Sequence, residues 1–337
     1  MLHGHGDDSY RFNREIVADF STNVWYGGEP VGLKDHLFKR WEIINRYPEV
    51  IAESLTEKIA AQHNLNPNNI LVNNGTTESI YLIAQLFQKS KTLIVVPSFS
   101  EYEDACSLYQ HEISFINWNE LNADYKFDSE LFFICNPNNP TGAVFYDFEK
   151  LIASNPTVTF VLDEAFIDFT LSITSAIKLI NTYKNLIILH SLTKNFAIPG
   201  LRLGYIAADK IIIDKLKSYK FPWSVNSLAL EAGHFIYDHF SSVQIPLKQL
   251  LADKRAFENG LQNAPVSILD SETHFFTAES QKGTASDLKA FLIENFGILI
   301  RDASNFRGLN EKHFRIATLS PQKNQLLITA LEAWNNH

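Results

Sequence analysis

Cysteine is scarce in this sequence, and so are long apolar runs and excess positive charge. The 337 residues include two cysteines, Cys106 and Cys135. They argue against a disulfide scaffold, and the lack of a CxxC spacing argues against a cysteine zinc site. No segment approaches the ~20 apolar residues of a membrane span, and a net charge of −9 supplies no basic face for nucleic acid. The opening stretch MLHGHGDDSYRF lacks the apolar core of a secretory signal. We therefore expect a cytoplasmic protein that binds neither nucleic acid nor a membrane.

Short apolar segments alternate with helical patterns through the middle of the chain. Such alternation is typical of a sheet that is buried on both faces, so it predicts a three-layer α/β/α domain with a mostly parallel sheet. The predicted strands are 70–73, 92–96, 113–117, 131–135, 159–162, 186–190 and 203–207. The predicted helices are 53–63, 77–88, 101–109, 147–154, 174–182 and 210–219.

The pattern changes after about Phe240. A long amphipathic stretch covers 242–261, and shorter strand-like and helical segments alternate from there to a last helix at 322–334. We predict a large domain over residues 45–240. Residues 1–44 and 241–337 are expected to form a smaller α+β domain with an N-terminal arm.

Two charged residues directly follow buried strands, where the loops of such sheets bind ligands. Asp163 ends the strand in TFVLDEAF, and a buried carboxylate needs a partner such as a protonated ring nitrogen. The ordinary alternative for Asp163 is an aspartate that caps a helix before a turn. Lys194 follows the strand LIILH in SLTKNFAIPGLRLGY, where desolvation turns a lysine into an amine nucleophile. A solvated surface lysine is the ordinary alternative.

Phosphate-binding chemistry surrounds these two residues. Ser191 and Thr193 offer hydroxyl groups, and Arg202 offers a two-pronged charged contact. In VNNGTTES, Gly75 permits a close approach of the backbone, and Thr76 and Thr77 stand at the start of a predicted helix whose free N–H groups favour an anion. An ordinary helix cap would look similar.

The stretch NPNNPTG, at 136–142, is the most specific motif. Two Asn-Pro steps impose a rigid, non-helical loop. Asn139 can then present its side-chain amide to a phenolate oxygen.

Together, NPNNPTG, DEAF, SLTK with an arginine eight residues later, and FRIAT resemble the class I/II aminotransferase superfamily of fold type I, which uses pyridoxal 5′-phosphate (PLP). The motifs run in the family's order from about Asn23 to Arg315. The resemblance implies a Schiff base on Lys194, a bond from Asp163 to the pyridine nitrogen and a bond from Asn139 to the O3′ oxygen. It also implies that Phe99 stacks on the ring, and that Thr76, Thr77, Ser191 and Arg202 hold the phosphate, with Gly75 and Thr193 beside them.

Further roles also follow from the resemblance. Arg315 matches the arginine that grips the substrate carboxylate, and Asn23 lies in the DFS-x-N motif near it. Tyr47, in RYPE, resembles a tyrosine that reaches the cofactor phosphate of a neighbouring subunit, which implies a homodimer. Phe166 departs from the pattern, because many aminotransferases have a tyrosine there whose hydroxyl binds O3′.

Two groups within the superfamily are closest in motifs. L-threonine-O-3-phosphate decarboxylases share GHG, PSFSEYE, DEAFIDF and IRDASNFRGL, and histidinol-phosphate aminotransferases share RYP and NPNNPTG. Both act on substrates with a distal phosphate, for which Arg301, Arg307, His3 and His5 are the candidate contacts. A flexible N-terminus is the ordinary alternative for the two histidines.

Two other classes fit the sequence less well. A nicotinamide dehydrogenase would need GxGxxG after its first strand, and none is present. A non-catalytic PLP-binding sensor would need neither Arg315 nor a productive substrate pose. The sequence therefore predicts a PLP-dependent enzyme, a decarboxylase first and an aminotransferase as the alternative.

Overall fold

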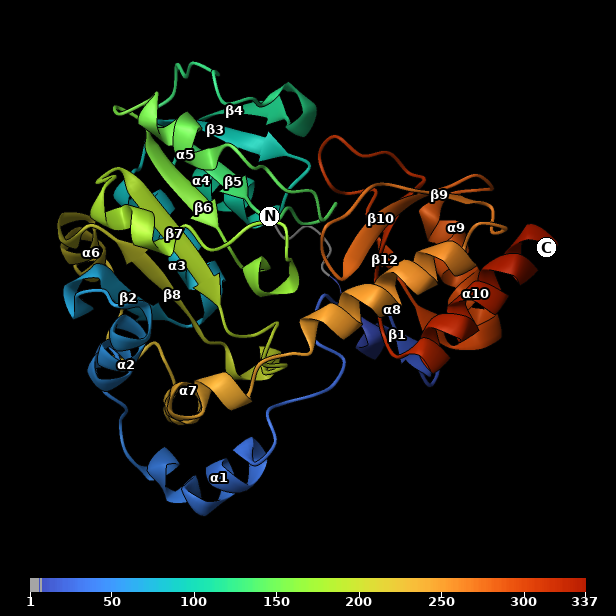
Figure 1. The fold of residues 1–337 in the computed structure, drawn as a ribbon, viewed down its shortest axis with the longest axis horizontal. Coiled ribbons are helices and arrows are strands. Elements are labelled where there is room, and N and C mark those ends of the chain that lie inside the picture. Colours follow the sequence, from blue (N-terminus) through green and yellow to red (C-terminus); the bar gives the residue numbers. More distant parts are fainter. Residues whose placement is uncertain (1–5, 7) are drawn as a thin grey trace.

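The computed structural model describes residue 6 and residues 8–337. The largest sheet of this part of the chain has seven strands, and Figure 1 shows its place in the molecule. Its strand order is β2-β8-β7-β6-β5-β3-β4. Strands β3 to β7 run parallel to their neighbours among themselves, whereas β8 is antiparallel to both β7 and β2. The bounds are β2 Ile70–Asn73, β3 Lys91–Val96, β4 Glu112–Asn117, β5 Leu131–Cys135, β6 Thr159–Asp163, β7 Leu186–Ser191 and β8 Gly204–Ala208.

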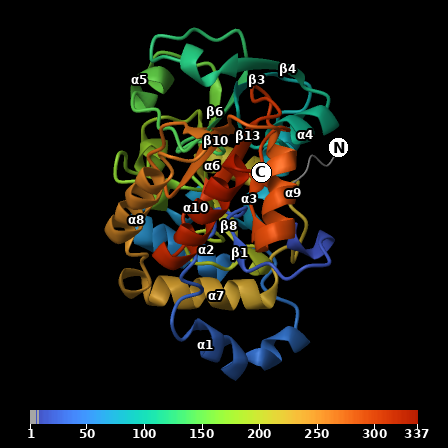
Figure 2. The ribbon, with the colours of Figure 1, turned by 90° about the vertical axis from the view of Figure 1, so that its right-hand side faces the viewer.

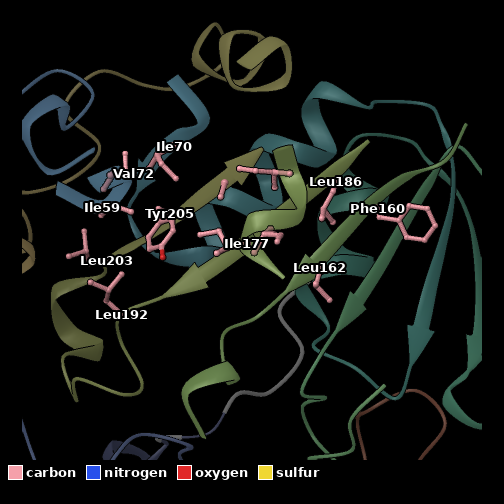
Figure 3. Close-up of a cluster of buried hydrophobic side chains, with 14 of the residues drawn as sticks. Ile59, Ile70, Val72, Phe160, Leu162, Ile177, Leu186, Leu192, Leu203 and Tyr205 are labelled. Carbon is pink, nitrogen blue, oxygen red and sulfur yellow. The ribbon is translucent and has the colours of Figure 1, made fainter. Parts of the chain in front are cut away.

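Helices cover both faces of this sheet because its strands are apolar on both sides. Along β2, Ile70 and Val72 pack into one core with α2 (Glu53–His63), α5 (Phe148–Ala153) and α7 (Ser227–Asp238), part of which is drawn in Figure 3. Leu71 points the other way, into a second core. That second core contains the buried faces of three helices: α3 (Gly75–Leu86), α4 (Glu101–Leu108) and α6 (Lys210–Lys217). This is the three-layer arrangement that the sequence predicts.

A second, four-stranded antiparallel sheet lies beside the first, with the order β12-β13-β10-β9 (Figure 1). Its helices lie together at the C-terminal end of the molecule, on the side that faces the viewer in Figure 2. They enclose a third apolar core. The bounds are β9 Val266–Ile268, β10 Phe275–Ser280, β12 Arg301–Asp302, β13 His313–Ala317, α8 Leu247–Gly260, α9 Ala285–Phe296 and α10 Pro321–Asn335.

The N-terminal segment touches both parts of the molecule. Strand β1 (Ala18–Asp19) pairs in parallel with β11 (Ile298–Leu299) of the smaller part. Helix α1 (Leu33–Lys39) instead packs against α7 of the larger part. The fold class is confirmed, and we retain the domain limits at 44/45 and 240/241 as a proposal.

One predicted helix is wrong. Residues 174–182 contain only a 3-10 turn, Ile177–Asn181, because the buried Glu164 carboxylate binds the chain just before it. Glu164 accepts hydrogen bonds from the Ser175 hydroxyl at 2.5 Å and from the Ala176 backbone N–H at 2.7 Å. In the part of the chain that the structure describes, no helix is both long and apolar enough to cross a membrane.

Candidate active site

A cavity of about 790 Å³ lies between the carboxyl ends of the large sheet and the loops of the small one. Most of the residues singled out by the sequence line it, although they come from segments up to 292 positions apart in the chain. They are Asn23, Thr76, Thr77, Phe99, Asn139, Asp163, Phe166, Ser191, Thr193, Lys194, Arg202, Arg301, Arg307 and Arg315. Gly75 lies directly behind this lining, as described below.

Asp163 ends β6 and is 4% exposed. Its Oδ2 accepts a hydrogen bond from the Tyr102 hydroxyl at 2.6 Å, and its Oδ1 accepts one from the Ala165 backbone N–H at 2.9 Å. Burial raises the pKa of Asp163, and these two donors oppose the rise because they stabilise the ionised form. The cavity lining therefore holds a buried carboxyl group that accepts hydrogen bonds and suits a cationic ring nitrogen as its partner.

Asn139 and Arg315 are joined directly across the cavity. Arg315 Nη1 donates to Asn139 Oδ1 at 2.5 Å, and Arg315 Nη2 donates to the Ser21 carbonyl at 2.6 Å. Asn23 Nδ2 donates a longer bond, 3.4 Å, to the same Asn139 oxygen. Because its Oδ1 is engaged by these donors, the Asn139 amide is oriented with its NH₂ group available to an acceptor.

Arg301 and Arg315 face the cavity as a cationic pair. They are opposite partners on β12 and β13, so their side chains stand on the same face of the small sheet. Both are more than nine-tenths buried. Burial, followed by repulsion from Arg301, lowers the pKa of Arg315 to about 9, and burial also lowers the pKa of Arg301. Arg315 remains charged at neutral pH, so two positive charges lie side by side in a nearly dry site that favours anionic ligands.

The predicted phosphate cradle forms where β2 enters α3. Gly75 has φ +77°, and a Cβ there would come within 2.6 Å of Arg202 Nη2. Glycine is thus required both for this backbone conformation and for the close approach of the guanidinium. Across the cradle, the Ser191 and Thr193 hydroxyls are 2.8 Å apart. Thr76 and Thr77 complete it at the N-terminus of α3, where free N–H groups attract an anion.

Lys194 stands in the loop after β7 and lines the same cavity as the cradle and Asp163. The loop is pinned to the N-terminal segment, because the Trp25 backbone N–H donates to the Lys194 carbonyl at 2.9 Å. Phe99 and Phe166 supply aromatic walls. Phe166 is 4% exposed and packs edge-on against Phe275, with ring centroids 4.8 Å apart, and it carries no hydroxyl to share with a ligand.

Two of the predicted residues, Tyr47 and Arg307, are placed differently from the rest. Tyr47 is 83% exposed, its ring lies 5.0 Å from that of Trp223 in a tilted arrangement, and it does not line the cavity of its own chain. Arg307 lines the cavity, but its guanidinium is engaged by Glu103 through bonds of 2.6 and 3.1 Å. His3 and His5 lie outside the described residues.

The sequence reasoning missed Tyr102. It lies three residues after Phe99 in PSFSEYE, and the two rings pack edge to face at 6.0 Å. A tyrosine one helical turn after a candidate stacking residue faces the same side, and this spacing is the signal that could have identified it.

Comparisons with known proteins agree with this site. Residues 33–331 match the model of the family described as aminotransferase class I and II. The crystal structure of L-threonine-O-3-phosphate decarboxylase from Porphyromonas gingivalis superposes with a TM-score of 0.93 at 39% identity, covering 95% of this chain and 100% of that one. Threonine-phosphate decarboxylase of Salmonella typhimurium is 31% identical, over 94% of this chain and 90% of its own. Histidinol-phosphate aminotransferase from Clostridium acetobutylicum has a TM-score of 0.85 at 27% identity, over 95% and 99% of the two chains.

The chain therefore belongs to the class I and II aminotransferase family. It is a PLP-dependent enzyme of that superfamily, as its motifs predict. The residues present fit the cofactor. The buried Asp163 carboxyl group suits a protonated pyridine. Gly75 lets the Arg202 guanidinium approach the N-terminus of α3, where a phosphate is favoured.

Proposed function

We propose that the protein decarboxylates L-threonine O-3-phosphate or a close analogue. The observation that carries this proposal is the pair Arg301 and Arg315, which present two positive charges to one cavity from opposite positions of neighbouring strands. A short substrate with two anionic groups, an α-carboxylate and a phosphate, suits such a pair. The 39% identity to the Porphyromonas gingivalis decarboxylase supports the same choice.

Each side chain has a task in this proposal. Asp163 keeps the ring nitrogen protonated, and Asn139, oriented by Arg315, donates its amide to O3′. Thr76, Thr77, Ser191 and Arg202 hold the cofactor phosphate, while Phe99 covers the ring. When bound through a Schiff base on Lys194, PLP supplies an electron sink for the bond that breaks at the substrate's Cα.

Lys194 then acts as the proton carrier. Its Nζ would carry a proton to the substrate's Cα, the atom from which CO₂ departs. The buried, apolar ring of Phe166 lines the same cavity and helps to exclude water there. Because Phe166 has no hydroxyl, Asn139 is the single side-chain donor to O3′ in this proposal.

An aminotransferase is the second candidate. A 2-oxo dicarboxylate also carries two anionic groups, so the pair Arg301 and Arg315 suits it as well. The 27% identity to the Clostridium acetobutylicum histidinol-phosphate aminotransferase supports this alternative.

We further propose that the working form is a cytoplasmic homodimer in which Tyr47 reaches the phosphate of the neighbouring subunit. What supports it is the position of Tyr47, which projects from the surface instead of lining its own cavity. Sedimentation velocity should give a dimer, and Tyr47→Phe should weaken PLP retention. A fully active monomer would contradict both parts.

The deciding experiment offers both substrates to the PLP-loaded protein. L-Threonine O-3-phosphate is incubated alone while CO₂ is followed, and histidinol phosphate is incubated with 2-oxoglutarate while glutamate is followed. CO₂ from the first supports the decarboxylase, and glutamate from the second without CO₂ supports the aminotransferase. Lys194→Ala serves as the inactive control in both.

A further inference from the structure

A buried lysine, Lys220, lies directly behind the cradle assigned to the phosphate. Its side chain is 1% exposed, and it does not line the cavity. It follows α6 and reaches back to the point where β2 becomes α3. A lysine is rarely buried to this degree without a specific partner, so its contacts identify what it does.

The Lys220 ammonium has an acceptor for each of its three protons. It donates to Asn73 Oδ1 at 3.0 Å, to both Glu78 carboxylate oxygens at 3.1 Å, and to Ser224 Oγ at 2.6 Å. Asn73 is the last residue of β2, and Glu78 lies in the first turn of α3. Lys220 therefore clamps the two ends of the turn that contains Gly75, Thr76 and Thr77.

Glu78 would oppose phosphate binding if it were alone. Its carboxylate accepts the Asn74 backbone N–H at 2.5 Å, at the same helix N-terminus that is to receive the anion. A negative charge one residue beyond Thr77 repels a phosphate dianion, and this repulsion is strong because the surroundings are partly dry. The Lys220 ammonium cancels that charge and keeps Glu78 in its tethering position.

We propose that Lys220 is a positioning residue for the cofactor phosphate, acting through Glu78 and Asn73 on the turn that forms the cradle. It does not touch the cofactor. The inference rests on the placement of the phosphate at Thr76, Thr77 and Arg202, and it is independent of which reaction the enzyme catalyses.

The test compares PLP with pyridoxal, which lacks the phosphate. Dissociation constants of both are measured by titrating full-length protein stripped of cofactor and following the visible imine band. Lys220→Met should weaken PLP binding about tenfold or more while pyridoxal binding changes less than about twofold. Equal losses of affinity for both ligands, or no loss of affinity for PLP, would overturn the proposal. A lysine that only stabilises the fold would affect the two dissociation constants equally.

Two further variants keep the test decisive should Lys220→Met fold poorly. Glu78→Gln removes the repelling charge and leaves the Lys220 ammonium with Asn73 and Ser224, so PLP affinity should be unchanged or higher. The double variant Glu78→Gln/Lys220→Met should restore most of the affinity lost in the single one. A tenfold loss of PLP affinity in Glu78→Gln would contradict the electrostatic role.

Matched controls separate this inference from the assignment of the cradle. Lys215→Met, an exposed lysine on α6, makes the same change in net charge and should leave both dissociation constants unchanged. Arg202→Ala should lower PLP affinity selectively. If it does not, the phosphate has been misplaced; if it does and Lys220→Met does not, only the role of Lys220 is wrong.

Discussion

The Tyr102 hydroxyl donates a 2.6 Å hydrogen bond to the Asp163 carboxylate, and both side chains are almost completely buried. Burial raises the pKa of the Tyr102 hydroxyl, so the tyrosine keeps its proton and donates the bond. Burial also raises the pKa of Asp163, and the bond from Tyr102 opposes that rise. The tyrosine thereby stabilises the ionised form of Asp163. This is the form that a cationic pyridine nitrogen needs as its partner.

Tyr102→Phe should therefore weaken the enzyme through its cofactor. Losing one hydrogen bond to a charged group costs about 1.5–3 kcal/mol, so we expect kcat to fall at least about tenfold with a smaller change in KM. The pKa of Asp163 should rise further, which moves the acid limb of the kcat profile to higher pH. Tyr109→Phe, at the end of the same helix, is the control, and an unchanged pH profile in Tyr102→Phe would contradict the argument.

Lys194→Ala should abolish the visible imine band of the PLP-loaded protein and all turnover. The fold should survive, because the side chain is only partly buried and the loop is held through the backbone bond from Trp25. Absorption spectra and circular dichroism check the two halves of this prediction. Lys323→Ala, on the exposed surface of α10, should behave like the unmodified protein. A variant at Lys194 that kept the band would mean that another amine binds PLP.

Arg315→Ala should affect the amino-acid substrate much more than the cofactor. Two charge-assisted hydrogen bonds to a carboxylate are worth about 3 kcal/mol together, which corresponds to an affinity loss of about 100-fold. PLP affinity should fall only severalfold, through the freed Asn139 amide that Arg315 now orients. Isothermal titration with a substrate analogue and PLP titration give the two numbers. Equal losses would show that Arg315 serves the cofactor instead, and the exposed Arg255→Ala should change neither.

The sequence predicts most of the large sheet because its strands are buried on both faces. The predicted limits of β2 and β5 agree with the structure to the residue, since continuous apolar runs between turn residues leave few alternatives. Helix α7 is not predicted. It is buried on most sides and so lacks a polar face, and Gly233 interrupts the pattern. The glycine is there for packing, because a Cβ would come within 2.6 Å of the Leu55 side chain.

The residues of the site also fall into two groups, those that the sequence identifies and those that it misses. Motifs identify residues at or just after the ends of strands, such as Asp163 at the end of β6 and Lys194 in the loop after β7, because their position in the chain fixes their place at the sheet edge. Partners that meet only in the folded chain escape this reasoning. Arg307 binds Glu103, 204 residues away in the sequence. Lys220 binds Glu78, 142 residues away. In each pair, the local sequence around one residue does not indicate its partner.

A buried histidine close to Arg315, His274, should make the folded protein less stable as the pH falls. His274 is fully buried, and burial together with the charges of Arg315 and Lys194 lowers its pKa from 6.5 to about 3. In the unfolded chain the same histidine titrates near its ordinary value of about 6.5. Between these two values the unfolded state binds the proton and the folded state does not. The contribution is therefore complete above pH 6.5 and is lost as the pH falls.

From pH 7 to pH 5 this single histidine should reduce the free energy of unfolding by about 2 kcal/mol. The measurement is the urea midpoint with saturating PLP at both pH values, compared between the unmodified protein and His274→Gln, which does not titrate. This comparison isolates the effect of His274 from that of histidines whose pKa is raised. For His190, burial lowers the pKa, but the hydrogen bond and the charge of Glu164 outweigh burial and raise it. His337→Gln, at the exposed C-terminus, should leave the pH dependence unchanged. If His274→Gln shows the same loss of stability as the unmodified protein, His274 is protonated in the folded state or exposed to solvent, and its burial beside Arg315 is not as described.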